Sequence, residues 1–487
     1  MSLIFIPYYI ALMGIEAYGI VGFYTTISIL LTVLDFGLST TLNREIAKNH
    51  HSQNAQEIRD LTRTLEIVYW IIAVCVGIFL FILISYFSKD WSYKISFLSK
   101  FYMGIAVCFQ MPFALYSGGL IGLKQQVLLN TIITISSTFR WAGAFAILYF
   151  ISPTITLFFI WQIIINFSQT IITAIFLWRH LPCRTQFAKF NKLSLIKVKN
   201  FATGITIITI LSIILTQTDK IILAKLLPLE TFGYYSLATM IANSINFFSA
   251  PICTTFFPRF TNLHFDKTEE PLKNTYHIGC QLMTVIVLPV AALLIFFSPE
   301  IVYLWTHNAI TITKTSSIIS LLTIGYLFNV FVQLPYFLQL SYGWTKLAVC
   351  QNIFGIILLI PLLLIGIHIL GVIGAAIIWI MLNLGYILIT IPIMHKKLLT
   401  SEKKAWYFKD VLLPCLGILP ILIISRYFFP KNPISDIIVI LYLIGVFLIS
   451  LLTTILLCPH AYRWLIEEIR KWLPKHFLKN IDQKNVP

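Results

Sequence analysis

The chain has 487 residues, of which 58% are hydrophobic and 11% are charged, and its mean hydropathy is +0.86. Soluble domains carry about 25% charged residues, so this composition excludes a soluble globular protein and indicates a polytopic membrane protein. The net charge is +16, and 26 of the 35 Lys and Arg residues fall in the tail and in the loops on one side of the predicted spans. This asymmetry marks the cytoplasmic side and contact with anionic lipid headgroups, so we predict no nucleic-acid partner.

Apolar runs predict an all-α protein with about 14 transmembrane helices and both termini in the cytoplasm. The first helix, before residue 14, has only about 12 apolar residues, or ~18 Å against a hydrocarbon core of ~30 Å. We therefore expect it to be truncated, by a misassigned start codon or by a real shortening. The other predicted spans are residues 18–42, 66–86, 100–122, 127–150, 153–178, 202–226, 231–258, 276–297, 316–341, 346–367, 371–394, 408–427 and 434–458.

Two internal matches indicate that the chain is a duplication. "LMGIEAYGIVGF" at 12–23 matches "LLPLETFGYYSL" at 226–237, an offset of 214 residues. "FQMPFALYSGGLIGLKQQVLLN" at 109–130 matches "VQLPYFLQLSYGWTKLAVCQN" at 332–352, an offset of 222–223. The offset spans an even number of helices, so the halves share one orientation, as in transporters built from parallel repeats.

The repeat predicts the domain organisation. We expect an N-terminal six-helix lobe over 1–180 and a C-terminal six-helix lobe over 201–395, which suits alternating access to a central cavity. A basic cytoplasmic linker at 181–200 joins the lobes, and two further helices occupy 396–458. The basic amphipathic tail at 459–487 is expected to lie on the inner leaflet or, alternatively, to dock a partner.

Polar stripes mark two repeat-related helices. Residues 25, 28, 32, 35 and 39 recur at spacings of 3 and 4 on the second helix, and this stripe includes Thr32 and Asp35. The eighth helix carries a similar stripe that ends in Asn243 and Asn246. Such stripes face other helices through hydrogen bonds or line a wet cavity, and their presence in both halves favours lining.

Charges inside spans are rare and point to function. Arg140 lies near the middle of its span and is either an anchor for an anionic substrate or part of a structural ion pair. Asp219 and Lys220 lie on the seventh helix, and Lys225 is expected to snorkel to the outer interface. Asp219 and Asp35 are the candidates for binding a coupling cation, H⁺ or Na⁺. Asp35 has Arg44 as an alternative, local partner.

Further candidates lie near helix ends and prolines. Gln110 and Gln333 each precede a proline by two residues, and they either bind substrate or support a hinge. Candidate cytoplasmic gate residues are Arg44, Lys124, Arg259 and Lys346. The eight cysteines are scattered and are interpreted as small core residues. No cofactor other than a coupling cation is predicted.

Enzyme signatures are weak. The chain has no Walker A, HExxH or GxSxG motif, and its outer loops are short. These features disfavour an ATPase and a membrane-embedded glycan polymerase or ligase, which is the competing class of function.

Three segments resemble one family: "LMGIEAYGIVGFYTTISILLTVLDFGLSTTLNREIA", "TDKIILAKLLPLETFGYYSLATMIANSINFFSAPICTTFFPRF" and "LGVIGAAIIW". They are similar to polysaccharide-transporter flippases, the O-antigen and capsule branch of the multidrug/oligosaccharidyl-lipid/polysaccharide exporter superfamily. The resemblance implies a bacterial inner-membrane protein that moves undecaprenyl-pyrophosphate-linked oligosaccharide to the outer leaflet, with Arg140 and Lys220 at pyrophosphate or acidic sugar. Polysaccharide polymerase machinery is a further possible partner. A lipid II flippase and a cation-coupled drug antiporter of the same superfamily are the alternatives.

Overall fold

The computed structural model describes residues 2–30, 34–35, 37–49, 55–87, 96–181, 187–191, 210–211, 213–265, 269–430 and 435–472. These residues are helical almost throughout, and they divide into two compact units, Met1–Ser236 and Leu237–Pro487. The predicted all-α class is confirmed. Ten of the described helical stretches are long and apolar enough to cross a membrane, and the predicted total of 14 stays a prediction.

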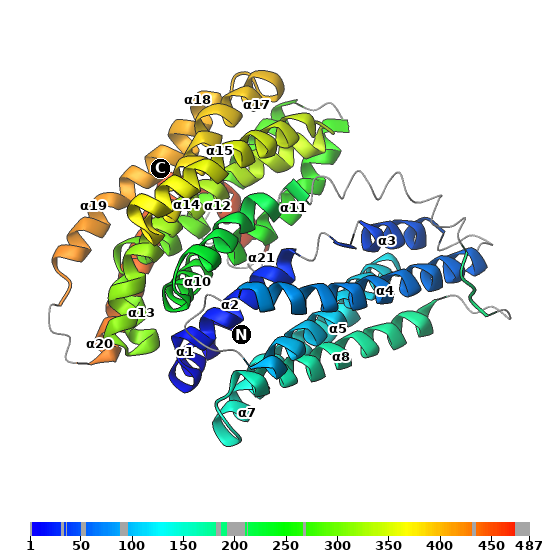
Figure 1. Ribbon diagram of the computed structural model, residues 1–487. Coiled ribbons are helices and arrows are strands. Elements are labelled where there is room, and N and C mark those ends of the chain that lie inside the picture. Colours follow the sequence, from blue (N-terminus) through cyan, green and yellow to red (C-terminus); the bar gives the residue numbers. More distant parts are fainter. Residues whose placement is uncertain are drawn as a thin grey trace, which may run out of the picture. The chain divides into compact units, whose positions relative to one another are not determined.

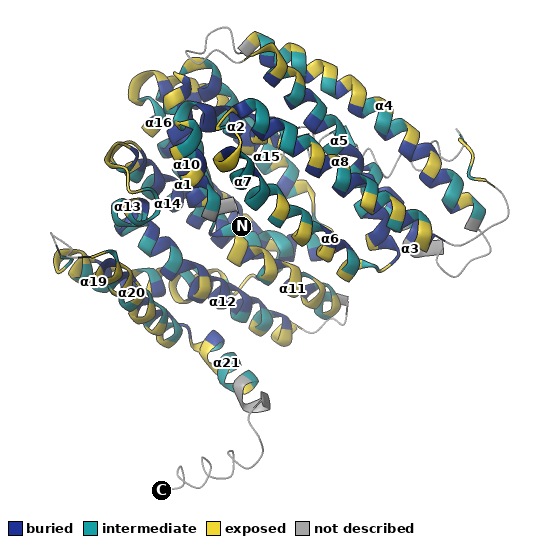
Figure 2. Ribbon diagram, turned by 90° about the horizontal axis from the view of Figure 1, so that it is seen from below, coloured by how far each residue is buried: buried dark blue, intermediate teal, exposed yellow. Residues whose placement is uncertain are grey.

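Unit 1 is built around three long helices that run side by side, with α5 between α4 and α8 (Figure 1). Their buried cores are rich in Leu, Ile and aromatic residues. Figure 2 shows an exposed face along α4, as expected for a helix that meets lipid. The elements are α1 (Ser2–Met13), α2 (Ile15–Leu30), α3 (Leu38–Asn49), α4 (Ala55–Phe87), α5 (Phe97–Gly122), α6 (Gln126–Thr138), η2 (Phe139–Gly143), α7 (Ala144–Phe150), α8 (Ile155–His180) and a helical segment at 213–226.

Unit 2 packs α12 and α16 against the long helix α14, and α15 against α16. The helix α10 (Leu229–Asn243) begins in unit 1 and ends in unit 2. Unit 2 continues through α11 (Asn246–Phe265), α12 (Glu269–Phe296), α13 (Ser298–Thr306), α14 (Ala309–Ser341), α15 (Lys346–Leu370), α16 (Val372–Gly385), η3 (Tyr386–Thr390), α17 (Ile391–Leu398), α18 (Lys403–Ala405), η4 (Trp406–Leu412), α19 (Leu413–Tyr427), α20 (Asp436–Leu457) and α21 (Pro459–Trp472). The predicted tail helix is thus present over 459–472.

A close crossing inside unit 1 supports the predicted repeat. A Cβ atom at Gly19 of α2 would lie 2.8 Å from the Leu229 carbonyl oxygen, and one at Gly233 of α10 would lie 2.6 Å from that of Ile15. The repeat pairs Gly19 with Gly233 and Ile15 with Leu229. The contact is therefore reciprocal, as expected about a two-fold axis, and both glycines are needed for the backbones to approach.

The predictions of continuous helices over 18–42 and 231–258 are wrong. The first is divided into α2 and α3, with Gly37 at a φ of 65° just before α3. The second is divided into α10 and α11 by a turn at 244–245. Each predicted polar stripe therefore extends over two helices.

The division into units falls after Ser236, whereas the predicted second lobe begins at residue 201. The segment 213–226 and the start of α10 belong to unit 1, where α10 crosses α2 at Gly19. Residues 192–209 lie outside the described part, so the linker and the lobe boundary predicted there stay predictions.

Candidate functional site

Arg140 lies in a π-helical turn, η2, that interrupts the predicted span 127–150. Two side chains donate hydrogen bonds to backbone carbonyls of this turn. Trp161 Nε1 donates to the Phe139 oxygen at 3.0 Å, and the Tyr9 hydroxyl donates to the Trp141 oxygen at 2.6 Å. A Cβ at Gly143 would lie 2.3 Å from the Trp161 ring, so glycine is required there. π-Helical turns recur at functional sites because they re-aim side chains.

The guanidinium of Arg140 has no acidic partner in the part of the chain that the structure describes. Its Nη2 donates to Gln169 Oε1 at 2.6 Å, and its buried Nε makes no hydrogen bond to a described residue. No carboxylate in the described part of the chain forms a salt bridge with it. The structural ion pair considered above is therefore not formed in the described part. An unpaired cation at membrane depth is costly, and an anionic ligand would relieve this cost.

Neutral polar groups surround this cation. The Tyr24 hydroxyl lies close to Arg140, Asn166 and Ser28. The Tyr24 and Ser28 hydroxyls and Asn166 Oδ1 are buried, and none of these atoms has a hydrogen-bond partner in the described residues. Unsatisfied buried groups of this kind are rare in folded proteins and call for an explanation. We define Tyr24, Ser28, Arg140, Asn166 and Gln169 as the Arg140 site.

A buried polar stripe on α8, which the sequence analysis missed, supports this site. Asn166 Nδ2 donates to the Ala106 carbonyl at 2.8 Å, and the Thr170 hydroxyl donates to that of Phe109 at 2.6 Å. Both acceptors are backbone carbonyls of α5, so these two hydrogen bonds join α8 to α5 beside the site. The spacing of the polar residues could have revealed the stripe, which consists of Gln162, Asn166, Gln169, Thr170 and Thr173.

Asp219 and Lys220 take different partners. Asp219 Oδ2 accepts from the Tyr235 hydroxyl at 2.5 Å, while its buried Oδ1 has no hydrogen-bond partner in the described residues. Lys220 Nζ donates to Gln217 Oε1 at 3.1 Å. Each charged group is therefore only partly compensated, which is consistent with ligand or cation binding. Lys225 Nζ lies 4.6 Å from the centroid of the Tyr86 ring, a cation–π contact typical of a snorkelling lysine.

Asp35 has a structural role at the start of α3. Its carboxylate accepts from the Ser39 amide at 3.3 Å and from the Ser39 hydroxyl at 2.8 Å, and the Tyr69 hydroxyl also donates to it. Asp35 thus satisfies the first turn of α3 in the manner of a cap. Thr32 and the side chain of Arg44 lie outside the described residues, so the predictions made for them stay predictions.

In unit 2, three predicted residues join one chain of carboxamides. Asn246 Nδ2 donates to Asn243 Oδ1 at 2.8 Å, and Gln333 Nε2 donates to Asn246 Oδ1 at 2.8 Å. Gln333 lies 3.5 Å from Asn329 Oδ1, and Asn329 donates to Asn383 Oδ1 at 2.9 Å. Sequence reasoning missed the last two residues. This amide chain crosses four helices and carries no formal charge.

The structure corrects the register of the second sequence match. Lys124 and Gly343 occupy the same place in two matching turns, with φ values of 60° and 65°. In both turns, the backbone amides of three successive residues donate to carbonyl oxygens of the preceding helix. The number of residues between each donor and its acceptor is the same in the two turns. The match paired Lys124 with Lys346, but Lys346 is the first residue of α15 and lies three residues further on.

The same shift separates the two glutamines. Gln110 lies 12 residues before the end of α5, whereas Gln333 lies 8 residues before the end of α14. The two are therefore about one helical turn apart in depth. Gln110 makes no side-chain hydrogen bond to a described residue, while Gln333 is part of the amide chain. The prediction that they are equivalent is wrong.

The gate candidates Lys346 and Arg259 lie at the first residue of α15 and inside α11, respectively. Lys346 is exposed, and Arg259 packs its guanidinium 5.5 Å from the Phe256 ring centroid on the same helix. With Lys124 in the α5–α6 turn, they lie where cytoplasmic loops were predicted. A gating role for these residues stays a prediction.

A buried ionic network in unit 2 escaped the sequence analysis. His277 Nδ1 lies 2.5 Å from Asp410 Oδ2, and its Nε2 lies 3.2 Å from Glu402. Gln281 donates to Asp410 at 2.9 Å and accepts the amides of His460 and Ala461 at the start of α21. The polar spacing His277, Gln281 and Thr284 was the available signal. These contacts hold α21 and η4 against α12.

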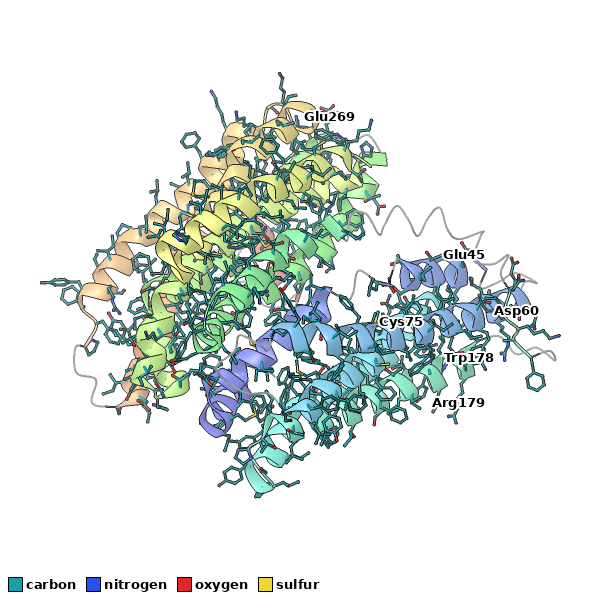
Figure 3. The ribbon with its side chains drawn as sticks, viewed as in Figure 1. Glu45, Asp60, Cys75, Trp178, Arg179 and Glu269 are labelled. Carbon is teal, nitrogen blue, oxygen red and sulfur yellow. The ribbon has the colours of Figure 1, made fainter. Side chains whose placement is uncertain are left out.

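Unit 1 has a comparable buried carboxylate. Glu66 accepts from the Tyr116 hydroxyl at 2.7 Å and the Trp178 indole at 3.3 Å, and it forms a salt bridge with Arg63 at 2.6 Å. Figure 3 shows Trp178 and Arg179 at the same end of unit 1 as Asp60. This end carries the basic segments that were predicted to be cytoplasmic. The contacts of Glu66 therefore hold the helices together near that end.

Comparison with known proteins identifies the family. Residues 1–264 match the polysaccharide biosynthesis protein family, and residues 205–365 match the MatE family. The first match covers more than half of the 487 residues. The chain belongs to the polysaccharide biosynthesis protein family. One relative is the "Putative O-antigen transporter" of Shigella flexneri, which is 23% identical to this chain over 379 residues. The aligned region covers 75% of this chain and 87% of that protein.

Solved structures show that the fold is that of the multidrug/oligosaccharidyl-lipid/polysaccharide (MOP) exporter superfamily. An inward-facing multidrug resistance MATE family transporter aligns with a TM-score of 0.66 and 14% identity, over 80% of this chain and 94% of that one. The lipid II flippase MurJ in an inward closed conformation aligns with a TM-score of 0.66 and 16% identity, over 91% and 95%. The family member described here therefore shares the fold of these membrane proteins, and ten of its described helical stretches are long and apolar enough to cross a membrane. The relatives and neighbours named here are transporters and flippases.

Proposed function

We propose that this protein is a flippase that moves an undecaprenyl-pyrophosphate-linked oligosaccharide from the inner to the outer leaflet of the bacterial inner membrane by alternating access. The Arg140 site carries the proposal. A guanidinium at membrane depth without an acidic partner in the described residues, surrounded by unsatisfied hydroxyl and amide groups, suits a pyrophosphate and the sugar attached to it. Membership of the polysaccharide biosynthesis family and the O-antigen transporter relative support this substrate class.

The amide chain and the second partly compensated site add to this proposal. Carboxamides both donate and accept hydrogen bonds, so Asn243, Asn246 and Gln333 suit the hydroxyl groups of a neutral sugar. Lys220 supplies a second cation, and Asp219 is the better placed candidate for a coupling H⁺ or Na⁺, since its Oδ1 is free of described partners. Polysaccharide polymerases and membrane lipids are the proposed partners, and both termini are proposed to lie in the cytoplasm.

Proteoliposomes test this function directly. The purified protein is reconstituted with a fluorescent lipid-linked oligosaccharide, and movement between leaflets is followed by quenching from outside. We expect movement without any change in the covalent structure of the substrate. Conversion to a longer glycan would instead indicate a polymerase or ligase. Transport of lipid II or of a cationic dye in preference to the oligosaccharide would replace the proposal with the corresponding alternative.

A further inference from the structure

An apolar groove lies on unit 2 between α15 and the α16–η3–α17 helix. Its volume is about 410 Å³, and its walls are formed by Leu347, Cys350, Gln351, Phe354, Gly355, Leu358, Leu359, Leu362, Ile378, Met381, Leu382, Gly385, Tyr386, Ile389, Thr390 and Ile393. From Leu347 to Leu362 it follows α15 for ~22 Å, at 1.5 Å per residue. This length exceeds one leaflet of a hydrocarbon core that is ~30 Å thick in total.

The polar groups of the groove are confined to one part of it. Gln351 and Thr390 lie near the end marked by Leu347 and Ile393. The Tyr386 hydroxyl lies close to Gln351, is buried, and makes no hydrogen bond of normal geometry to a described residue. Beyond this tier the walls are aliphatic and aromatic only. The groove therefore has one end able to donate and accept hydrogen bonds and one end suited to hydrocarbon.

The polar end opens beside cations. Lys346 is the first residue of α15, and Lys397 lies one helical turn after the groove residue Ile393. Lys397 Nζ lies 4.1 Å from the Trp344 ring centroid, and both lysines are exposed. Interfacial Trp and Lys side chains are typical of headgroup level, and the positive-inside pattern assigns this end to the cytoplasmic leaflet.

We propose that this groove binds an anionic glycerophospholipid of the cytoplasmic leaflet. Its phosphate contacts Lys346 and Lys397, its ester groups meet Gln351, Thr390 and the Tyr386 hydroxyl, and one acyl chain fills the aliphatic part. The order of cation, hydrogen-bonding tier and hydrocarbon matches this amphiphile. A polyprenyl pyrophosphate has no ester groups between phosphate and hydrocarbon, so it leaves the middle tier unmatched. The site stands independently of which substrate the transporter moves.

Native mass spectrometry of the full-length protein measures the binding. The protein is released from nanodiscs that contain phosphatidylglycerol and phosphatidylcholine in equal amounts, and retained lipid is counted. Gly385→Leu fills the groove, because nothing lies within 4 Å of an added Cβ. We expect it to weaken phosphatidylglycerol retention about tenfold, the loss of nearly two buried methylene groups. Gly445→Leu on α20, where an added Cβ also meets open space, is the matched control and should retain the lipid.

A second pair of variants keeps the test decisive if Gly385→Leu does not fold. Lys346→Gln with Lys397→Gln should abolish the preference for phosphatidylglycerol over phosphatidylcholine, whereas Lys403→Gln with Lys404→Gln should preserve it. Equal retention of the two lipids by the unaltered protein would overturn the proposal. So would undecaprenyl phosphate displacing phosphatidylglycerol in the unaltered protein but not in Gly385→Leu, since the groove would then hold the polyprenyl chain.

Discussion

The two units differ in how their mid-span polar residues are compensated, although each also has a buried, partnered carboxylate, Glu66 in unit 1 and Asp410 in unit 2. At membrane depth, unit 1 carries Arg140, Asp219 and Lys220, none of which forms a salt bridge with a described residue. Amides and a hydroxyl supply their hydrogen bonds, and the adjacent charges of Asp219 and Lys220 attract each other. Unit 2 joins its mid-span polar residues in a neutral amide chain, and its buried Asp410 is paired with His277. Incomplete compensation suits a group that must receive a ligand, whereas full compensation suits a group that holds helices together. Four predictions test this contrast.

The largest effect is expected where compensation is complete. Asp410→Ala should lower the free energy of unfolding by about 3–5 kcal/mol, because His277 and Gln281 lose their buried partner. Thermal unfolding in detergent measures this loss. Asp436→Ala, which removes an exposed carboxylate 3.9 Å from His307, should change little. If both variants unfold alike, the network is not a structural fastening.

At the Arg140 site, a substitution should change the transport rate and not the stability. Arg140→Ala is expected to slow oligosaccharide movement about 10- to 100-fold, since a charge-assisted hydrogen bond contributes ~1.5–3 kcal/mol. The unfolding temperature should not fall. The measurement is the initial rate in proteoliposomes at equal protein incorporation.

Arg426→Ala is the control for that variant, because Arg426 already pairs with Glu300 at 2.6 Å and lies at a helix end. Unchanged transport by Arg140→Ala would remove Arg140 from substrate binding. A clear loss of stability in Arg140→Ala would assign it to the fold instead.

The register correction predicts a difference between two glutamines. Gln333→Leu should cost ~1 kcal/mol in unfolding, because the half-buried amides of Asn246 and Asn329 lose a hydrogen-bond partner. Gln110→Leu, which breaks no described hydrogen bond, should cost less. Denaturation of the two variants side by side measures the difference, and equal costs would restore the equivalence indicated by the sequence match.

The smallest expected effect depends on pH. Burial and then the neighbouring charge of His277 hold the pKa of His460 below its ordinary value of 6.5, so the folded state favours the neutral ring. As pH falls through 6.5, the unfolded state binds the proton more readily, and the attachment of α21 is weakened. Because His460 is partly exposed, the change should stay under ~1 kcal/mol.

Hydrogen exchange of residues 459–468 measures this effect. Exchange should quicken, after correction for intrinsic rates, between about pH 7.5 and 5.5, a range that brackets the ordinary histidine pKa. His460→Gln should remove the dependence. A variant that keeps the full dependence would show that another group titrates there. Burial raises the pKa of Glu402, but hydrogen bonds from Ser401 and His277 lower it by more, so this pKa lies below its usual value of 4.5. Glu402 therefore stays ionised across this pH range, and its contribution to stability does not change there.

Some features of this protein were determined by the sequence itself. Hydropathy established the class, because a continuous run of about 20 apolar residues can satisfy its own backbone in lipid only as a helix. Duplication was visible at Gly19 and Gly233, since the close approach there tolerates no side chain. Arg140 was identifiable as a functional candidate because a charge at membrane depth is costly wherever its helix packs.

Only the tertiary structure decided which polar groups meet. Asp410 was not among the candidates of the sequence analysis, yet it is wholly buried against His277, which lies more than a hundred residues earlier. Asp35 belongs to the predicted polar stripe, and only the break at Gly37 lets its carboxylate cap the first turn of α3, while its predicted cation-binding role stays a prediction. The shift between Gln110 and Gln333 likewise depends on where each helix ends. Such pairings are set by packing between distant segments, and periodicity along one helix does not specify them.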